Sequence, residues 1–149
     1  MSDLKELSEL AWKGLLDTKF EHHPVHTFYE GSTEIKPNIL GMKGIGGFFA
    51  VDTGDGLVMI DAGSQLDIET GYEEIKKWRP NDHLKAAIFT HHHVDHVFAI
   101  QKFDEECESK KLPLPKVYSH NLTPEHFDRY ILTNGWNTAI NRRQFAIDV

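Results

Sequence analysis

Several features of other protein classes are scarce or missing in this 149-residue sequence. One cysteine, Cys107, leaves no partner for a disulfide within the chain and fits a reducing cytoplasm. No apolar run approaches the roughly 18 residues that a membrane helix needs. The opening stretch MSDLKELSEL is charged and lacks the apolar segment of a secretory signal. We therefore expect a cytoplasmic protein without a membrane partner.

Positively charged residues are also fewer than acidic ones. Lysine and arginine total 16 against 23 acidic residues, for a formal net charge of −7 with neutral histidines. An acidic chain without a basic stripe argues against nucleic acid as a partner. Hydrophobic residues make up 40% of the chain, which suits one soluble domain with a core. Histidine is abundant instead, because four of the ten histidines fall within residues 91–96.

The hydrophobic pattern predicts a mixed α/β fold. We expect an N-terminal segment, 1–20, built on an amphipathic helix over 3–16, and one domain over 21–149. Leu4, Leu7, Ala11 and Leu15 lie on one face of that helix. In the domain, strands that alternate with helices favour a largely parallel sheet after an opening hairpin.

The expected elements follow from local signals. Asp55-Gly56 lies between two apolar runs and predicts a hairpin. Ser64 is a suitable N-cap, and Thr123-Pro124 is typical of a helix start. The expected strands are 25–29, 37–43, 48–51, 57–60, 84–89 and 116–119; the expected helices are 64–78, 95–103, one from Thr123 closed by Asn134-Gly135, and 136–145; turn-rich or charged connections cover 31–36 and 105–115.

The chemistry is concentrated in the stretch THHHVDH, residues 90–96, which follows an expected buried strand. Side chains at i and i+2 of an extended segment point the same way, so His91 and His93 can chelate one ion while His92 points elsewhere. Asp95 and His96 lie at the following turn and can face a second ion. Imidazole and carboxylate suit zinc, iron or manganese. The position at a strand end is also where α/β sheets hold ligands.

The pattern His91-x-His93-x-Asp95-His96 after an apolar strand resembles the signature of the metallo-β-lactamase superfamily of hydrolases. The upstream stretch GLVMIDAG, residues 56–63, resembles the first motif of that family, a strand that ends in Asp61 before a glycine turn. The match runs from about residue 25 to the C-terminus. The stretch 128–145, from Asp128-Arg129-Tyr130 through Asn141-Arg142-Arg143-Gln144-Phe145, is similar to the alkylsulfatase-related branch.

The resemblance implies an αββα sandwich of two similar halves, of which this chain resembles the N-terminal half. It implies that Asp61 is a carboxylate behind the metal ligands, which orients them by hydrogen bonds. It also implies that two zinc ions bind if the site is completed, with Asp95 and His96 as catalytic residues. The ligands that the second half of the family fold supplies have no counterpart after Phe145.

The expected function is therefore a metal-dependent hydrolase of small molecules, in which metal-activated water attacks an ester-like centre. Sulfate ester, lactam, thioester and phosphoester substrates all remain open, and the branch resemblance favours the first. The alternative is a truncated, non-catalytic half-domain that acts through self-association or partner binding. The missing ligands support that alternative.

Three further residues are candidates for the pocket. If strand 116–119 lies parallel beside 84–89, His120 emerges at the same sheet edge as the histidine motif; otherwise it is a loop histidine or caps a helix. Arg142 and Arg143 can bind a sulfate or carboxylate, or lie on a solvated helix face. The glycine-rich stretch 41–47 is expected to be a loop beside the site.

The strands also predict the assembly. Their apolar residues are consecutive, so both faces of the sheet need cover, and the helices near it can cover one. We therefore expect a homodimer, in which a second copy covers the other face. The alternative is that the N-terminal or the C-terminal helix folds over that face of a monomer.

Overall fold

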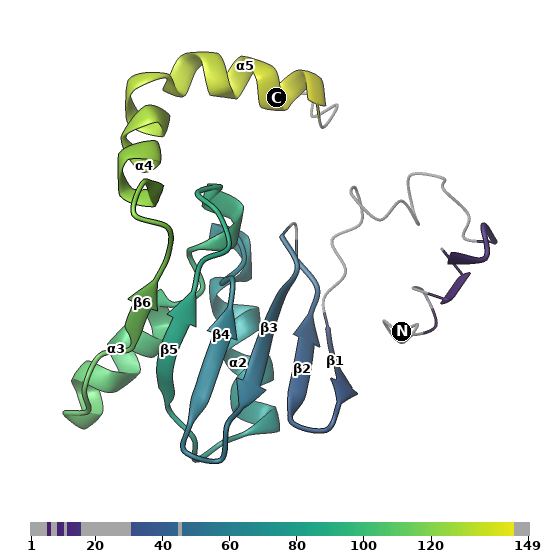
Figure 1. Cartoon of the computed structure of the whole chain (residues 1–149), viewed down its shortest axis with the longest axis vertical. Helices are drawn as coiled ribbons and strands as arrows, with labels where there is room; N and C mark the ends of the chain where they lie inside the picture. Colours follow the sequence, from purple (N-terminus) through teal and green to yellow (C-terminus); the bar gives the residue numbers. More distant parts are fainter. Residues whose placement is uncertain (1–5, 7–8, 11, 16–30, 45, 145–149) are drawn as a thin grey trace.

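The computed structural model describes residues 6, 9–10, 12–15, 31–44 and 46–144, and its centre is one six-stranded sheet (Figure 1). The strands follow the order of the chain across the sheet. They are β1 (Ser32–Lys36), β2 (Ile39–Met42), β3 (Phe48–Asp52), β4 (Leu57–Ile60), β5 (Leu84–Ile88) and β6 (Lys116–Tyr118).

The sheet changes from antiparallel to parallel at β4. Strands β1 to β4 pair antiparallel, whereas β4–β5 and β5–β6 pair parallel. The parallel pairs put the carboxyl ends of β4, β5 and β6 at the same edge of the sheet. The segments that follow these strands begin with Asp61, Phe89 and Ser119, so this edge collects the residues with expected chemistry.

The helices divide into two groups. Helices α2 (Ile68–Trp78) and α3 (Gln101–Lys110) lie behind the sheet in Figure 1, whereas α4 (Thr123–Leu132) and α5 (Asn134–Gln144) lie beyond the site edge. Short 3₁₀ turns, η2 (Gln65–Asp67) and η3 (Val94–His96), precede α2 and α3. None of the described helices is long and apolar enough to cross a bilayer.

The hydrophobic core lies between the sheet and the first pair of helices. Phe48, Leu57, Met59, Ile75 and Phe103 are fully buried. Phe48 and Met59 come from the sheet face toward α2, because successive side chains of a strand alternate between faces. Gly71 lets α2 approach closely, since a Cβ there would lie 2.8 Å from the Phe48 ring.

The other face of the sheet carries apolar side chains in register. Phe49 pairs with Ile60, Ile60 with Ile88, and Ile88 with Tyr118, which gives one row across four strands. Phe49, Ile88 and Tyr118 keep 39%, 42% and 55% of their surface exposed. The two-sided apolar character expected from the sequence is therefore present in the sheet.

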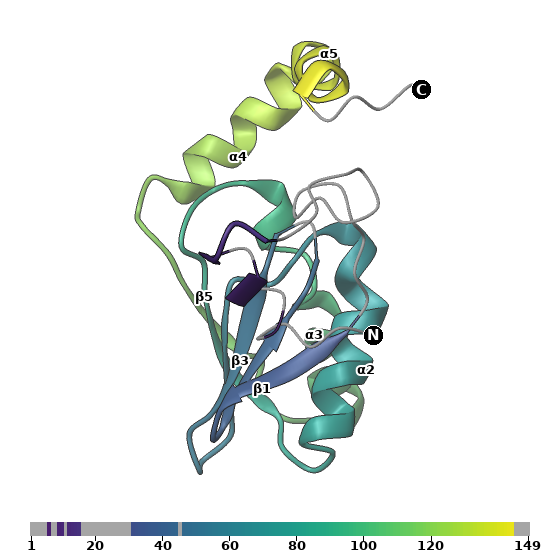
Figure 2. The same cartoon turned by 90° about the vertical axis from the view of Figure 1, so that its right-hand side faces the viewer.

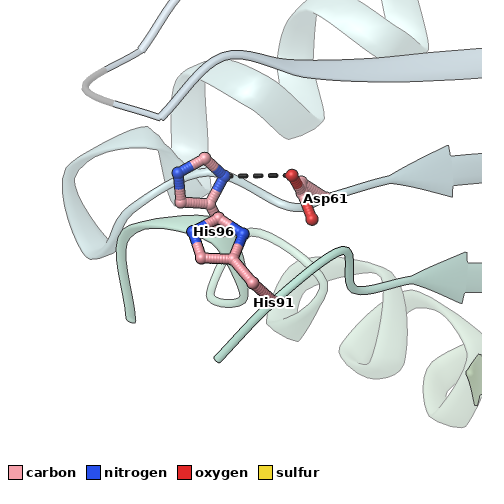
Figure 3. A group of neighbouring side chains, drawn as sticks. All are labelled: Asp61, His91 and His96. Atoms are coloured by element: carbon pink, nitrogen blue, oxygen red, sulfur yellow. Dashed lines mark hydrogen bonds and ion pairs between the residues drawn. The ribbon is translucent and has the colours of Figure 1, made fainter. Parts of the chain in front are cut away.

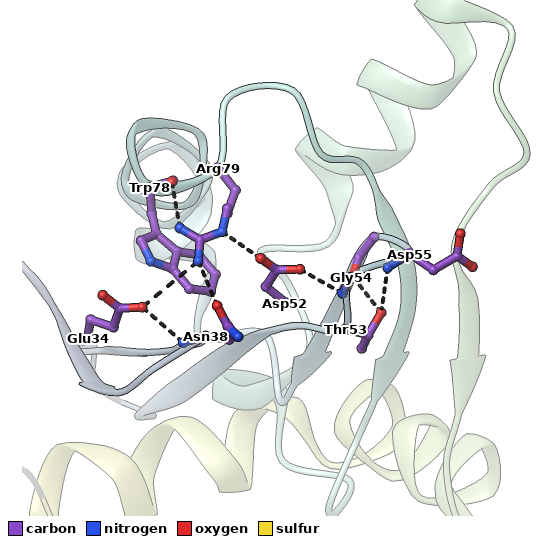
Figure 4. Close-up of polar contacts among 9 residues, drawn as sticks. Glu34, Asn38, Asp52, Thr53, Gly54, Asp55, Trp78 and Arg79 are labelled. Atoms are coloured by element: carbon purple, nitrogen blue, oxygen red, sulfur yellow. Dashed lines mark hydrogen bonds and ion pairs between the residues drawn. The ribbon is translucent and has the colours of Figure 1, made fainter.

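Arg79 joins the end of α2 to two hairpins at the edge opposite the candidate site (Figure 4). Its Nε donates to Asp52 Oδ2 at 2.7 Å, and its Nη2 donates to Asn38 Oδ1 at 3.0 Å. The guanidinium carbon also lies 4.0 Å from the centre of the Trp78 ring. Two hydrogen bonds hold the pKa of Asp52 below its usual value: the one from Arg79 has the larger effect, and the one from the Gly54 N–H adds to it.

The structure confirms much of the expected element order and corrects several parts. The hairpin 48–60, the strands near 84 and 116 and the Ser64 cap are confirmed. The stretch 31–36 is not a connection, because β1 occupies Ser32–Lys36. The expected strand 25–29 and most of the helix 3–16 lie outside the described residues.

The largest correction concerns residues 95–115. Instead of a helix over 95–103 and a loop over 105–115, η3 is followed by α3 over Gln101–Lys110. The buried stripe of α3 consists of Phe103, Glu106 and Cys107. Because Glu106 is charged, the hydrophobic pattern of the sequence does not indicate this stripe. Thr123 lies inside α4 and does not cap it, and Asn134 begins α5.

Candidate metal centre

The histidine motif lies at the carboxyl edge of the sheet, where the loop after β5 faces the turn after β4. Asp61, His91 and His96 each offer one ligand atom, and these atoms lie within 4.8 Å of one another (Figure 3). Backbone hydrogen bonds hold the two segments together, from the Ala62 N–H to the His96 carbonyl at 2.6 Å and from the Ala99 N–H to the Ala62 carbonyl at 2.5 Å. The sheet register thus brings together residues about 30 positions apart.

Asp61 is the centre of the hydrogen bonds at this edge. Its Oδ1 accepts the Thr90 N–H at 2.8 Å, and the Thr90 hydroxyl lies 3.0 and 2.8 Å from its two oxygens. Asp61 is buried and has φ 56°, a left-handed conformation that costs a non-glycine residue about 1–3 kcal/mol. The turn therefore holds the carboxylate in one orientation at the expense of backbone strain.

These hydrogen bonds select one tautomer for each of two histidines. A carboxylate can only accept, so Nδ1 of His96, at 3.0 Å from Asp61 Oδ2, carries the proton. The Thr90 hydroxyl gives its one proton to Asp61 and therefore accepts from His91 Nδ1 at 2.9 Å. In both neutral rings the unprotonated nitrogen is then Nε2, which is free to bind a metal ion.

The remaining motif residues lie beside these two rings. The ring centres of His93 and His96 lie 4.6 and 4.3 Å from that of His91. Nε2 of His96 lies 3.6 Å from Asp95 Oδ2. Two ligand atoms on one tetrahedral zinc, each at about 2.1 Å, are separated by roughly 3.4 Å. The donor types and this spacing fit a divalent ion between Asp95 and His96.

The environment favours a neutral His91. Burial lowers its pKa, and the neighbouring His96 and His93 lower it further. Neutral imidazole is the form that binds metal ions.

The glycine-rich loop flanks the centre, as the sequence predicts. A Cβ on Gly46 would lie 2.5 Å from the Asp95 carbonyl oxygen and 2.9 Å from the His96 ring. The loop from β2 to β3 thus packs its backbone directly on the metal-motif turn, and this approach requires glycine.

Other sequence candidates lie outside this group. His120 follows β6 at the same edge but is exposed, and its Nδ1 accepts the Leu122 N–H at 3.2 Å before α4. The N-cap of α4 is Leu122, without a side-chain cap, so His120 makes this contact as a loop residue before the helix. Arg142 and Arg143 belong to α5, and their side chains lie outside the described part of the structure.

The sequence reasoning missed Thr90 and the contacts of His92. Thr90 directly precedes the histidine motif in the sequence, and this position could have indicated a contact with the site. His92 turns away from the metal group toward α4, where its ring stacks on His126 with centres 4.4 Å apart. No local pattern links these two residues.

Comparison with solved structures shows a shared fold. The chain is similar to the stereoselective inverting sec-alkylsulfatase Pisa1 from Pseudomonas sp., with a TM-score of 0.55 and 22% identity over 70% of this chain and 17% of that one. It is also similar to a metallo-β-lactamase from Cronobacter sakazakii with an HARLDQ motif, with a TM-score of 0.52 and 19% identity over 66% of this chain and 38% of that one. The chain thus spans less than half of either protein.

The sequence comparisons agree with the fold. No curated protein matches the chain. The family model of the metallo-beta-lactamase superfamily matches residues 47–137, more than half of the chain. This range contains Asp61, the histidine motif and α4, and the sheet holds one part of the family's mixed α/β fold. The chain belongs to the metallo-β-lactamase superfamily.

Proposed function

We propose that this chain carries the metal-binding half of a metal-dependent hydrolase for small ester-like substrates. The observation that carries the proposal is the convergence of Asp61, His91 and His96, whose ligand atoms lie within 4.8 Å of one another in a chain of this superfamily. Their hydrogen bonds leave Nε2 of both histidines available.

The residues divide into two pairs of ligands. His91 and His93 hold one ion, and Asp95 and His96 hold the second, with Asp61 behind them as the orienting carboxylate. Zinc suits these nitrogen and oxygen donors, and iron or manganese are alternatives. A bound divalent ion polarises a substrate oxygen and lowers the pKa of water. The ligand positions that remain are filled from outside this part of the fold, by water or by the substrate.

In this proposal the residues around the metal site have distinct roles. Asp61 keeps the proton of His96 on Nδ1 and, through Thr90, that of His91 on Nδ1. Asp95 orients the attacking water with its carboxylate. The Gly46 loop packs against the turn that carries Asp95 and His96 and holds it in place.

The substrate class we propose is a sulfate ester. Two observations support it: the fold shared with a protein named as a sec-alkylsulfatase, and the alkylsulfatase-like stretch 128–145. Lactam, thioester and phosphoester substrates are the competing classes.

The test is hydrolysis by the zinc-loaded chain. Four matched substrates, an alkyl sulfate, an alkyl phosphate, a thioester and a lactam, are incubated with wild type, His93→Ala and the control His83→Ala, whose half-buried side chain precedes β5 at the opposite edge of the sheet. We expect wild type and the control to release sulfate from the alkyl sulfate, and we expect no release by His93→Ala or after chelation. Zinc-loaded protein that hydrolyses none of the four supports the non-catalytic half-domain instead.

A further inference from the structure

His92 stands between the two histidines of the first ligand pair, but its ring faces α4. The ring stacks on His126 with centres 4.4 Å apart and planes at 24°. Its Nε2 lies 3.5 Å from Nη2 of Arg129, and its centre lies 6.4 Å from the Tyr130 ring. His126, Arg129 and Tyr130 are spaced i, i+3 and i+4, so they share one face of α4.

The contact between the His92 ring and α4 is attractive. The arginine side chain has only hydrogen-bond donors, so Nε2 of His92 is the acceptor toward Arg129. This contact requires an Nε2 without a proton, as in a neutral imidazole ring. Near-parallel aromatic rings at this separation attract one another by about 0.5–1.5 kcal/mol beyond their burial. The single ring of His92 therefore contacts α4 by both stacking and a long polar contact.

Helix α4 is otherwise peripheral. Ile131 and Leu132 on it are 78% and 83% exposed, and α4 stands away from the core helices α2 and α3 (Figures 1 and 2). Its N-terminal end follows β6 at the site edge, which places its first turns beside the metal loop. A contact from His92 is thus well placed to fix α4 relative to the candidate site.

We propose that His92 is a positioning residue that couples metal binding in the loop to the order of α4. This inference rests on the proposed function, because it assumes that His91 and His93 bind an ion. Ligation fixes the residues on both sides of His92, and hence fixes the Cα from which its ring reaches α4. The helix is then held as one wall of the substrate site.

Coupling of this kind is reciprocal. If bound zinc strengthens the contact between His92 and α4 by some factor, then that contact strengthens zinc binding by the same factor. The stacking energy corresponds to a factor of about two to ten. His92 therefore affects zinc affinity without offering a ligand atom to the ion.

Amide hydrogen exchange of α4, measured with and without zinc, tests this coupling. In metal-free protein we expect His92→Ala to speed exchange of α4 two- to tenfold. Zinc should slow that exchange in wild type by a similar factor and have little effect in His92→Ala. The zinc affinity of His92→Ala should fall by the factor by which zinc slows the exchange of α4 in wild type.

Two conservative variants separate the contributions, and one control checks specificity. His92→Phe keeps a stacking ring, and His92→Gln keeps an acceptor; we expect His92→Phe to restore more protection. Glu125→Gln, on the exposed surface of α4, should behave as wild type. Wild type that binds zinc with unchanged exchange in α4 overturns the coupling but not the proposed function. Wild type that binds no zinc overturns both.

Discussion

Nδ1 of His96 lies 3.0 Å from Oδ2 of Asp61, 35 residues earlier in the chain. This contact joins the turn after β4 to the loop after β5, and a second path from Asp61 through Thr90 reaches His91. One carboxylate therefore orients two imidazole rings, one from each proposed ligand pair.

The first prediction concerns a variant that lacks the Asp61 carboxylate. Asp61→Ala should weaken zinc affinity about 10- to 100-fold, the usual effect of losing a residue that orients metal ligands. It should also destabilise the fold, because the Thr90 N–H loses its acceptor. Calorimetric zinc titration checks the affinity. Asp61→Asn should lose less stability, since asparagine tolerates positive φ and keeps an acceptor. Wild-type affinity in Asp61→Ala would remove Asp61 from the metal centre.

The second prediction concerns the close approach of the glycine loop. Gly46→Ala should displace the turn that carries Asp95 and His96, because its Cβ would lie 2.5 Å from a backbone oxygen. We expect a loss of zinc affinity of about tenfold or more, on the scale of a displaced supporting group. Gly135→Ala is the matched control: it has open space around its Cβ and lies in α5, so it should leave affinity unchanged. Equal affinities for the two variants would contradict the contact.

The third prediction concerns a buried ion pair away from the site. Glu106 Oε1 lies 2.6 Å from Lys76 Nζ and 2.5 Å from Lys110 Nζ, and its side chain is 4% exposed. Burial acts to raise the pKa of Glu106, but the hydrogen bonds from Lys110 and Lys76 hold it below 4.5. Glu106→Ala should cost about 1–3 kcal/mol, because the half-buried Lys76 loses its carboxylate partner, although its Nζ keeps the hydrogen bond to the Asp82 carbonyl. Denaturant unfolding measures this cost.

The same group gives a pH dependence. Its folded-state pKa lies below the value of 4.5 for the free side chain, so the ion pairs stabilise the fold above about pH 4.5. This contribution is lost as the pH falls through the lower, folded-state pKa. Acid unfolding of wild type should therefore be steeper below pH 4.5 than that of Glu106→Gln. Parallel acid transitions of the two proteins would show that Glu106 is not responsible.

The fourth prediction is the homodimer. The row Phe49, Ile60, Ile88 and Tyr118 lies on the face away from α2 and is continuous across four strands. A second copy that presents the same face would cover it. Light scattering after size exclusion should give twice the chain mass of 17.1 kDa. Ile88→Lys should yield monomer, whereas Ile131→Lys, on exposed α4, should not. A wild-type mass near 17 kDa at all concentrations would show a monomer.

The parts of the fold that the sequence predicts are those with local causes. The hairpin over 48–60 follows from Asp55-Gly56 between apolar runs, and Ser64 caps its helix through its own side chain. Helix α3 was misplaced because a charged residue, Glu106, occupies its buried stripe. Strand β1 was missed because its residues STEIK are mostly polar and it lies at the sheet edge.

The candidate site divides in the same way. The spacing of His91, His93, Asp95 and His96 marks the proposed ligands, which all come from one loop. The family resemblance implies that Asp61 orients the histidine loop, but its hydrogen bond to His96 depends on the pairing of β4 with β5, which neither the resemblance nor the spacing specified. The stacking of His92 on His126 depends on where α4 docks, and neither the spacing nor the resemblance contains that information.

Metal binding by the histidine loop can be measured by elemental analysis of zinc-equilibrated, gel-filtered protein. Wild type should retain zinc, up to two ions per chain when both ligand pairs are filled. His91→Ala and His93→Ala should lose the ion of the first ligand pair, so that they retain at most the ion held by Asp95 and His96, and should keep the circular dichroism of the wild type, because both residues lie in a loop outside the core. Folded wild type without zinc, or variants with the same zinc content as wild type, would show that the two histidines do not bind metal.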